Sequence, residues 1–361
     1  HRPLLLLGGA TGMIGDPSGR DDERSLNTGD MVGAWVQALQ AQVSGFLEFE
    51  AENDNAAKIV NNLDWTHDLP VIDFLREIGK HFSVNSMIQR DSVKTRLERS
   101  NEGISYTEFS YMLLQAMDFL RLAQSENCLL QIGGSDQWGN IVSGIDLIRR
   151  HTGESAFAFT MPLVTKADGT KFGKSAAGAV WIDPKKTSPY AFYQFWLNTA
   201  DADVVSFLKL FTFLAQDEIE SLEVEIQDRP ELRKAHKKLA QEVTTIVHGE
   251  QAVVAAERIS AALFAGDAGQ LLESDLQELQ QDGMPCTSCA AGTGLLTAMV
   301  EAGLTKSTGE ARKLIQANGI KLNGDSIDDV GRDLTFEDAL FKRFYLLRKG
   351  KKNYHLIARP R

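Results

Sequence analysis

The chain has 361 residues, of which 43% are apolar and 24% are charged, and its formal net charge is −11. Such a composition predicts a folded chain of two or three domains and excludes long disorder, collagen-like repeats and a small disulfide scaffold. No apolar run approaches the roughly 20 residues that a membrane-spanning helix needs, so a membrane protein is not expected. The cysteines, Cys128, Cys286 and Cys289, fit a reducing cytoplasm and predict no metal site.

The first part of the chain, up to about residue 188, alternates short apolar runs with amphipathic stretches, which is typical of a parallel α/β sheet with crossover helices. Residues 4–7, 129–132 and 157–164 read as strands. Glycines at 8, 9, 12 and 15 follow the first strand and allow a ligand to approach the carboxyl edge of the sheet. Nucleotide-sugar epimerases share this spacing, but the following Asp-Pro-Ser-Gly favours a turn over a phosphate-binding helix. Those enzymes also need a Tyr-x-x-x-Lys pair, whereas Tyr111 has Gln115 at that spacing.

A helix expected around residues 109–120 places Tyr111, Gln115 and Asp118 on one face, at i, i+4 and i+7. Its flanking residues are nearly all apolar or aromatic, so this polar stripe is expected to face a partly buried cavity rather than solvent. A carboxylate there can accept a hydroxyl group, and the other two side chains suit an amino group. The pattern therefore indicates a small amphiphilic ligand such as an amino acid.

The next strand ends in Gly133-Gly134, followed by Ser135, Asp136 and Gln137. Either Ser135 or Asp136 is expected to cap the helix that follows. Asp136 and Gln137 follow the two glycines at the end of the strand, and this arrangement also suits recognition of ribose hydroxyls.

Residues 166–175 form an expected loop in which Lys171 and Lys174 lie three positions apart among glycines. A mobile loop with two cations can close on a polyphosphate and stabilise charge on a leaving pyrophosphate.

The remainder of the chain reads as two further units. Residues 188–279 carry helical patterns without strand signals, and a stretch rich in glycine follows at 283–294. The last unit is expected to contain helices at 295–302 and 309–317, the second capped by Ser307, and a hairpin turn at Asn323-Gly324. Residues 341–361 hold eight Lys or Arg and no Asp or Glu, whereas the other 340 residues hold 30 basic and 49 acidic ones. Apolar runs at 344–347 and 354–357 around a basic segment predict a β-hairpin with a basic turn, which is typical of an RNA-contacting module.

Taken in order, these segments and the terminal module resemble the bacterial-type tyrosyl-tRNA synthetases, a family of class I aminoacyl-tRNA synthetases, over essentially the whole chain. The resemblance implies a Rossmann-like α/β catalytic domain at 1–188, an all-helical anticodon-recognition domain at 189–285 and a small α+β RNA-binding domain at 293–361. It also implies formation of tyrosyl-adenylate from tyrosine and ATP with Mg²⁺, and transfer to the 3′ end of tRNA(Tyr). A homodimer joined through residues 71–88 and a cytoplasmic location are further expectations.

The resemblance assigns roles by matching positions. Tyrosine binding is assigned to Asp16, Tyr111, Gln115, Asp118 and Gln131. ATP binding is assigned to Gly133, Gly134, Asp136, Gln137 and Lys174. Catalysis by charge stabilisation is assigned to Arg20, Arg24, Lys171, Lys174 and Ser175. RNA binding is assigned to Arg348, Lys349, Lys351 and Lys352. No protein nucleophile is expected, because the substrate's own carboxylate attacks the α-phosphate.

The sequence departs from the family in one respect. Family members carry a first strand and a His-x-Gly-His signature before the position of His1, so the catalytic domain is expected to lack its first strand and helix and to activate tyrosine poorly. Two alternatives stay open: a tryptophanyl-type synthetase, against which Asp118 and the RNA module speak, and a synthetase-like RNA-binding protein that has lost its chemistry.

Overall fold

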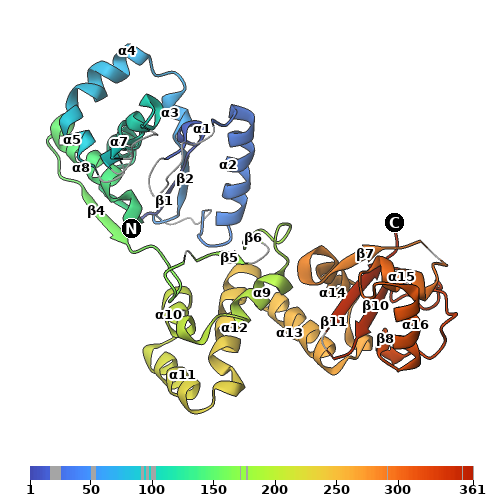
Figure 1. Cartoon of the computed structure of the whole chain (residues 1–361). Coiled ribbons are helices and arrows are strands. Elements are labelled where there is room, and N and C mark those ends of the chain that lie inside the picture. Colours follow the sequence, from blue (N-terminus) through green and yellow to red (C-terminus); the bar gives the residue numbers. More distant parts are fainter. Residues whose placement is uncertain are drawn as a thin grey trace. The chain divides into compact units, whose positions relative to one another are not determined.

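The computed structural model describes the chain except residues 17–25, 50–53, 91–92, 95–96, 99–102, 171, 176–177, 291, 352 and 361, together with the side chains of Lys174 and Ser175. The chain divides into two compact units, His1–Thr165 and Lys166–Arg361, which Figure 1 colours blue to green and green to red. Among the described residues, no helix combines the length and the apolar character needed to cross a membrane.

The first unit contains two pairs of parallel strands, and three of the four strands lie where the sequence predicts them, whereas β2 was not predicted. Strand β1 (Leu4–Leu7) pairs with β2 (Lys58–Asn61), and β3 (Leu130–Gly134) pairs with β4 (Phe157–Met161). Between the strands lie the helices α1 (Thr11–Ile14), α2 (Gly29–Val43), α3 (Leu63–Thr66), α4 (Val71–Asp73), α5 (Val84–Ile88), α7 (Tyr106–Glu126) and α8 (Trp138–Thr152). Parallel pairs joined through helices are typical of a Rossmann-like domain, which confirms the predicted fold class.

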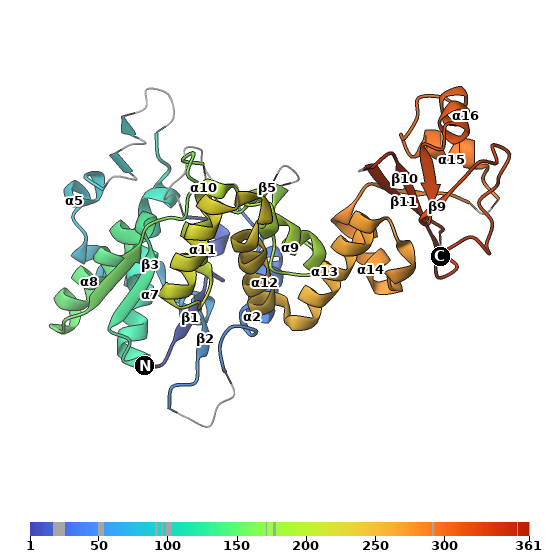
Figure 2. The ribbon, with the colours of Figure 1, turned by 90° about the horizontal axis from the view of Figure 1, so that it is seen from below.

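The core of this unit lies between α7 and α8, which run side by side in Figures 1 and 2. Buried Ala116, Met117 and Phe119 of α7 pack with Ile148 of α8. Gly144 makes this contact possible, because a Cβ at this position would lie 2.9 Å from Cδ1 of Phe119. The helix α7 is therefore anchored by its apolar face, and its polar stripe is held on the opposite side.

The second unit begins with a helical part, as predicted for residues 188–279. Its helices are α9 (Pro189–Leu197), α10 (Asp201–Phe211), α11 (Gln216–Asp228), α12 (Lys234–His248), α13 (Glu250–Ala265) and α14 (Glu273–Glu278). Ser188 caps α9 by accepting from the N–H of Ala191, and Pro189 occupies the first helical position, where its missing N–H costs nothing. Leu239, Ala240 and Val243 of α12 are buried at helical spacing, so packing rather than propensity holds this part together.

The C-terminal part of the second unit is a five-stranded mixed sheet of order β7-β11-β10-β8-β9. The strands are β7 (Cys286–Ser288), β8 (Ile320–Leu322), β9 (Asp325–Ser326), β10 (Phe344–Lys349) and β11 (Asn353–Ala358), and the helices are α15 (Leu295–Glu301) and α16 (Thr308–Gln316). The sheet and both helices enclose one core that includes Leu295, Ile315 and Leu347. Both predicted hairpins and the Ser307 cap, which accepts from the N–H of Glu310, are confirmed.

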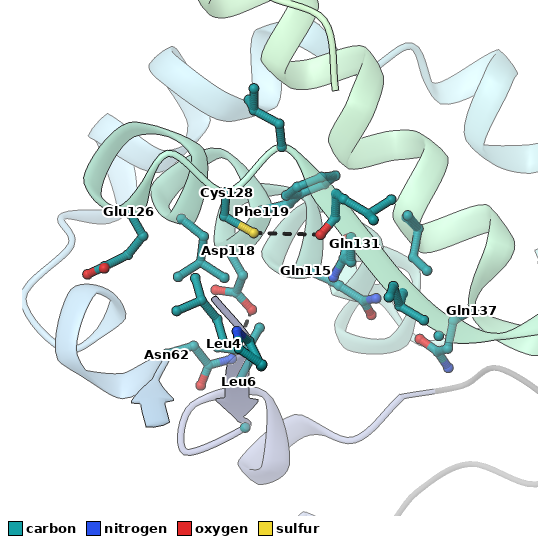
Figure 3. A pocket seen from close by; sticks show the side chains of 18 of the residues that line it. Leu4, Leu6, Asn62, Gln115, Asp118, Phe119, Glu126, Cys128, Gln131 and Gln137 are labelled. Carbon is teal, nitrogen blue, oxygen red and sulfur yellow. Dashed lines mark hydrogen bonds between the residues drawn. The ribbon is translucent and has the colours of Figure 1, made fainter. Parts of the chain in front are cut away.

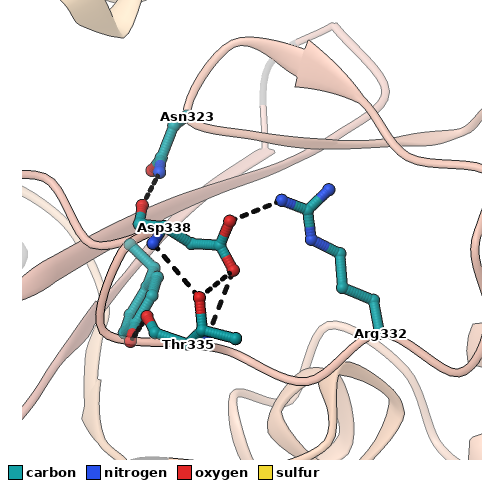
Figure 4. Close-up of polar contacts among 5 residues, drawn as sticks. Asn323, Arg332, Thr335 and Asp338 are labelled. Atoms are coloured by element: carbon teal, nitrogen blue, oxygen red, sulfur yellow. Dashed lines mark hydrogen bonds and ion pairs between the residues drawn. The ribbon is translucent and has the colours of Figure 1, made fainter.

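The connection between β9 and β10 is held by a polar network (Figure 4). Asp338 accepts from Arg332 at 2.6 Å and from the hydroxyl of Thr335 at 2.7 Å. The backbone carbonyl of Asp338 accepts from the side chain of Asn323 at 2.6 Å, and that of Thr335 accepts from the hydroxyl of Tyr345 at 2.5 Å. These bonds tie a segment without regular structure to the sheet and so fix how it presents its remaining side chains.

One local prediction is wrong. Neither Ser135 nor Asp136 caps α8: these residues form a short 3-10 turn, and Gln137 is the N-cap residue without a side-chain cap among the described residues. The chain enters α8 through that turn instead of the extended backbone that a capping side chain needs.

Candidate functional site

The first unit contains an open pocket of about 840 Å³ between β1 and β3 (Figure 3). Apolar walls come from Leu4 and Leu6 of β1 and from Leu130 and Ile132 of β3. The side of α7 that carries its polar residues faces the same pocket, and so does the turn after β1, through Gly8 and Thr11. Apolar walls with a few polar groups on one side suit a ligand that is partly aromatic and partly polar.

Most residues predicted from sequence for the amino acid and the nucleotide lie in or beside this pocket. Those that line it are Tyr111, Gln115, Asp118, Gln131, Gly133 and Gln137. Asp16 lies beside them, because its Oδ2 accepts from Nε2 of Gln137 at 2.6 Å. Gly134 and Asp136 follow at the end of β3, where a Cβ on Gly134 would lie 2.5 Å from Oδ1 of Asp136. Segments about 100 residues apart therefore share one hollow, as the sequence predicts.

Asp118 is the most deeply buried polar residue of this set, with 1% of its surface exposed. Its Oδ1 accepts from Nε1 of Trp65 at 2.8 Å, and its Oδ2 accepts from Nδ2 of Asn62 at 2.9 Å. Burial raises the pKa of Asp118 from its ordinary value of 3.8 to about 6, although both hydrogen bonds act in the opposite direction. Each donor is neutral, so the carboxylate keeps acceptor capacity for a polar group of a ligand.

Sequence reasoning missed Asn62 and Trp65, which hold Asp118 in place. Asn62 is fully used: its Nδ2 donates to Asp118 and to Oγ1 of Thr11 at 2.9 Å, and its Oδ1 accepts from the N–H of Ala10 at 2.8 Å. It thereby joins the ends of β1 and β2 to α7. The available signal was an Asn-Asn pair directly after a short apolar strand, at the edge where parallel sheets bind ligands.

Gln131 offers a second acceptor to the pocket. Its Oε1 is buried and has no hydrogen-bond partner among the described residues. A buried amide oxygen without a partner is costly, and a donor on a ligand would satisfy it. Tyr111 and Gln115 line the same pocket, two turns and one turn before Asp118 on α7, so the polar groups of α7 face one region of the pocket.

The predicted phosphate-binding residues are described only in part. Arg20, Arg24 and Lys171 lie outside the described residues. The backbones of Lys174 and Ser175 form β5 (Lys174–Ser175), which pairs with β6 (Gly178–Ala179). Phe172, two residues before β5, packs against four aromatic rings of α9 and α10 at centroid distances of 4.9–5.7 Å. This contact attaches the loop to the helical part of its unit.

The basic hairpin divides into residues that are bound within the chain and residues that are not buried. Nζ of Lys349 donates to the carbonyl of Leu304 at 2.6 Å and lies 3.4 Å from Oε1 of Glu310. Nη1 of Arg348 lies 3.2 Å from the hydroxyl of Tyr354. Lys351 is exposed, and Lys352 lies outside the described residues.

Comparison with known proteins agrees with this geometry. The family profile of class I tRNA synthetases for tryptophan and tyrosine matches residues 1–265, and that of the C-terminal domain of tyrosine–tRNA ligases matches residues 275–357. Tyrosine–tRNA ligases of Aliivibrio salmonicida and Geobacillus stearothermophilus are each 53% identical to the chain, over 99% of the chain and 84% of the relative. A mitochondrial tyrosyl-tRNA synthetase of Aspergillus nidulans has a similar structure, with a TM-score of 0.62 and 30% identity over 73% of this chain and 77% of that one.

The fold and the pocket thus define a class I aminoacyl-tRNA synthetase. Within that class, the identities and both profiles show that the chain belongs to the family of tyrosine–tRNA ligases, enzymes that use ATP as a substrate.

Proposed function

We propose that the pocket between β1 and β3 binds the tyrosine substrate, with Asp118 accepting a hydrogen bond from the phenolic hydroxyl. The observation that carries this proposal is a buried carboxylate whose two donors, Asn62 and Trp65, are both neutral. The leucine and isoleucine side chains of β1 and β3 suit the ring, and the free oxygen of Gln131 suits the ammonium group. Tyr111, Gln115 and Asp16 would complete the contacts to that ammonium group.

The reaction that follows needs positioning and charge stabilisation rather than a protein nucleophile. The carboxylate of tyrosine attacks the α-phosphate of ATP, the bond to the β-phosphate breaks, and pyrophosphate leaves. Gly133, Gly134, Asp136 and Gln137 would hold the adenosine and the reacting carboxyl group. Lys171, Lys174, Ser175, Arg20 and Arg24 would stabilise charge on the pyrophosphate.

Mg²⁺ is proposed to arrive with ATP. Among the described residues, no group of three His, Cys, Asp or Glu side chains is arranged to hold a metal ion. Mg²⁺ keeps several waters and prefers substrate phosphates to a cage of protein ligands, which fits that arrangement. Its chemistry would be to neutralise phosphate charge.

We also propose that the chain has three domains, forms a homodimer and is located in the cytoplasm. We retain boundaries at 1–188, 189–285 and 293–361, with the last domain contacting tRNA(Tyr) through Arg348, Lys349, Lys351 and Lys352. For the dimer, the support is an exposed apolar surface within residues 71–88, where Val71, Ile72 and Val84 are 70%, 63% and 56% exposed. Exposed apolar patches of this kind mark interaction sites.

The test is amino-acid-dependent exchange of labelled pyrophosphate into ATP. Exchange that is fastest with tyrosine, and much slower with phenylalanine or tryptophan, is expected. In an Asp118→Asn variant, kcat/KM for tyrosine should fall by about 10- to 150-fold, because a hydrogen bond to a charged group contributes about 1.5–3 kcal/mol. The rate with phenylalanine, which has no hydroxyl, should change little.

The matched control is Glu126→Gln. Glu126 lines the same pocket, but it already accepts from Nζ of Lys58 at 2.5 Å, so its removal should leave the choice between tyrosine and phenylalanine intact. Equal losses for the two amino acids in Asp118→Asn would show that Asp118 does not recognise the hydroxyl.

A further inference from the structure

The segment before β10 presents two exposed phenyl rings, and two cations lie near the first of them. Phe336 and Phe341 are 50% and 46% exposed. Cζ of Arg359 lies 4.7 Å from the ring centroid of Phe336, and Nζ of Lys342 lies 5.9 Å from it. These four residues, called the Phe336 patch below, are not among those predicted from sequence, and the tyrosine reaction does not use them.

The backbone of this patch is held in an unfavourable conformation. Phe341 and Lys342 are consecutive residues with φ of +50° and +59°, in the left-handed region that glycine adopts easily and L residues do not. The turn is closed by hydrogen bonds from Lys342 N to Ala339 O at 3.1 Å and from Arg343 N to Leu340 O at 3.0 Å. A bulky ring and a cation are kept where glycine would fit better, and strain retained in this way marks a surface whose side chains are needed.

The charge of the patch is positive. Two carboxylates, Glu337 and Asp338, directly follow Phe336 in the sequence. The charge of Asp338 is compensated, because it is paired with Arg332 and accepts from Thr335, as Figure 4 shows. Glu337 is exposed and is a single charge against Lys342 and Arg359. The strands β10 and β11 pair from Phe344↔Ala358 to Lys349↔Asn353, so the patch lies at the opposite end of this hairpin from the basic turn. At 3.4 Å per residue the paired strands are about 17 Å long, and a ligand that contacts both ends must therefore be long.

We propose that the Phe336 patch is a stacking site for unpaired bases of tRNA. Proteins that recognise single-stranded RNA combine aromatic rings, on which bases stack, with cations that follow the backbone. Phenyl rings and arginine are also enriched in protein interfaces, so a protein partner is the alternative that the test below distinguishes. The proposal rests on the proposed tRNA binding by the C-terminal part and adds to it a second contact region that reads unpaired nucleotides, distinct from the basic turn.

The test is binding of a tRNA(Tyr) transcript to the full chain, measured by filter binding at several salt concentrations. The informative variant is Phe341→Gly, because glycine relieves the left-handed strain while removing the ring. The melting temperature should stay the same or rise, whereas Kd should increase by about 5- to 150-fold, the range for loss of one stacked base. In Lys342→Ala, the slope of log Kd against log salt should fall by about 0.7–0.9, as for one phosphate contact.

Controls separate this proposal from the others. Val224→Ala removes an equally exposed apolar group from the acidic helix α11 and should leave Kd unchanged, and Glu337→Gln should leave binding equal or tighter. Calorimetric binding of tyrosine should be unaffected in every one of these variants, so the absence of tyrosine binding by the unaltered chain would count against the proposed function and not against the patch. Unchanged Kd in both Phe341→Gly and Lys342→Ala would overturn the proposal, and so would a change confined to the oligomeric state.

Discussion

Two buried aspartates, one in each unit, are held in opposite ways. Asp118 in the first unit is 1% exposed, and its hydrogen-bond donors among the described residues, Asn62 and Trp65, are both neutral. Asp275 in the second unit is 0% exposed and is paired in bidentate fashion with Arg258, at 2.7 and 2.8 Å, while its Oδ2 also accepts from the N–H of Leu272.

The difference separates a carboxylate kept for a ligand from one kept for the fold. A cation of the protein beside Asp118 would neutralise the carboxylate and compete with a phenolic donor. Neutral donors position the carboxylate and leave its charge available to a ligand. Asp275 has a different role: it joins the start of α14 to α13, and the pairing with Arg258 compensates its buried charge. A buried acid with neutral partners therefore points to binding, and one with a bidentate arginine points to structure.

The largest effect is expected where the structural pair is broken. Arg258→Met leaves the charge of Asp275 buried without its cation, which should lower the free energy of unfolding by about 3–5 kcal/mol. Adding Asp275→Asn should restore much of this loss, because no unpaired charge remains and Oδ1 of the amide can still accept from Leu272. Chemical denaturation of the single and double variants measures the coupling. Additive losses would mean that the pair contributes no more than its separate contacts.

How far the sequence reveals this contrast depends on the distance between partners. Glycine-ended strands, helical spacing and turn residues predict both units, because these signals act between residues close in sequence. The polar stripe of α7 and the glycine turn after β1 predict the pocket for the same reason. Asn62 and Trp65 reach Asp118 across 56 and 53 residues, and only Asn62 carries a local signal, the Asn-Asn pair at the end of β2. Likewise, nothing local reveals that Nζ of Lys349 donates to the carbonyl of Leu304, 45 residues earlier.

The second prediction concerns pH, since burial raises the pKa of Asp118 from 3.8 to about 6. The ligand-free folded chain then binds a proton that the unfolded chain has already lost, so the contribution of Asp118 to stability falls as pH rises from about 4 to 6. Tyrosine affinity should change in the opposite direction, because only the ionised carboxylate accepts well from the phenol. Below pH 6, Kd for tyrosine should rise by up to about tenfold for each unit by which the pH falls.

Calorimetric titration with tyrosine between pH 5 and 8 checks this expectation. The pH dependence should disappear in Asp118→Asn. If it persists there, the pH dependence of tyrosine binding does not come from Asp118.

The smallest effect tests whether neutral donors matter beyond filling space. Trp65→Phe keeps an aromatic ring but removes the Nε1–H that donates to Oδ1 of Asp118, a bond that contributes about 1.5–3 kcal/mol when the carboxylate is ionised. The carboxylate loses one of the two interactions that favour its ionised form, so its pKa should rise further. Tyrosine binding at pH 7 should weaken by about two- to tenfold, and the midpoint of its pH dependence should move upward. A residue that only packs would weaken binding equally at every pH, so the shift of the midpoint distinguishes a donor that tunes Asp118 from a ring that merely supports the wall of the pocket.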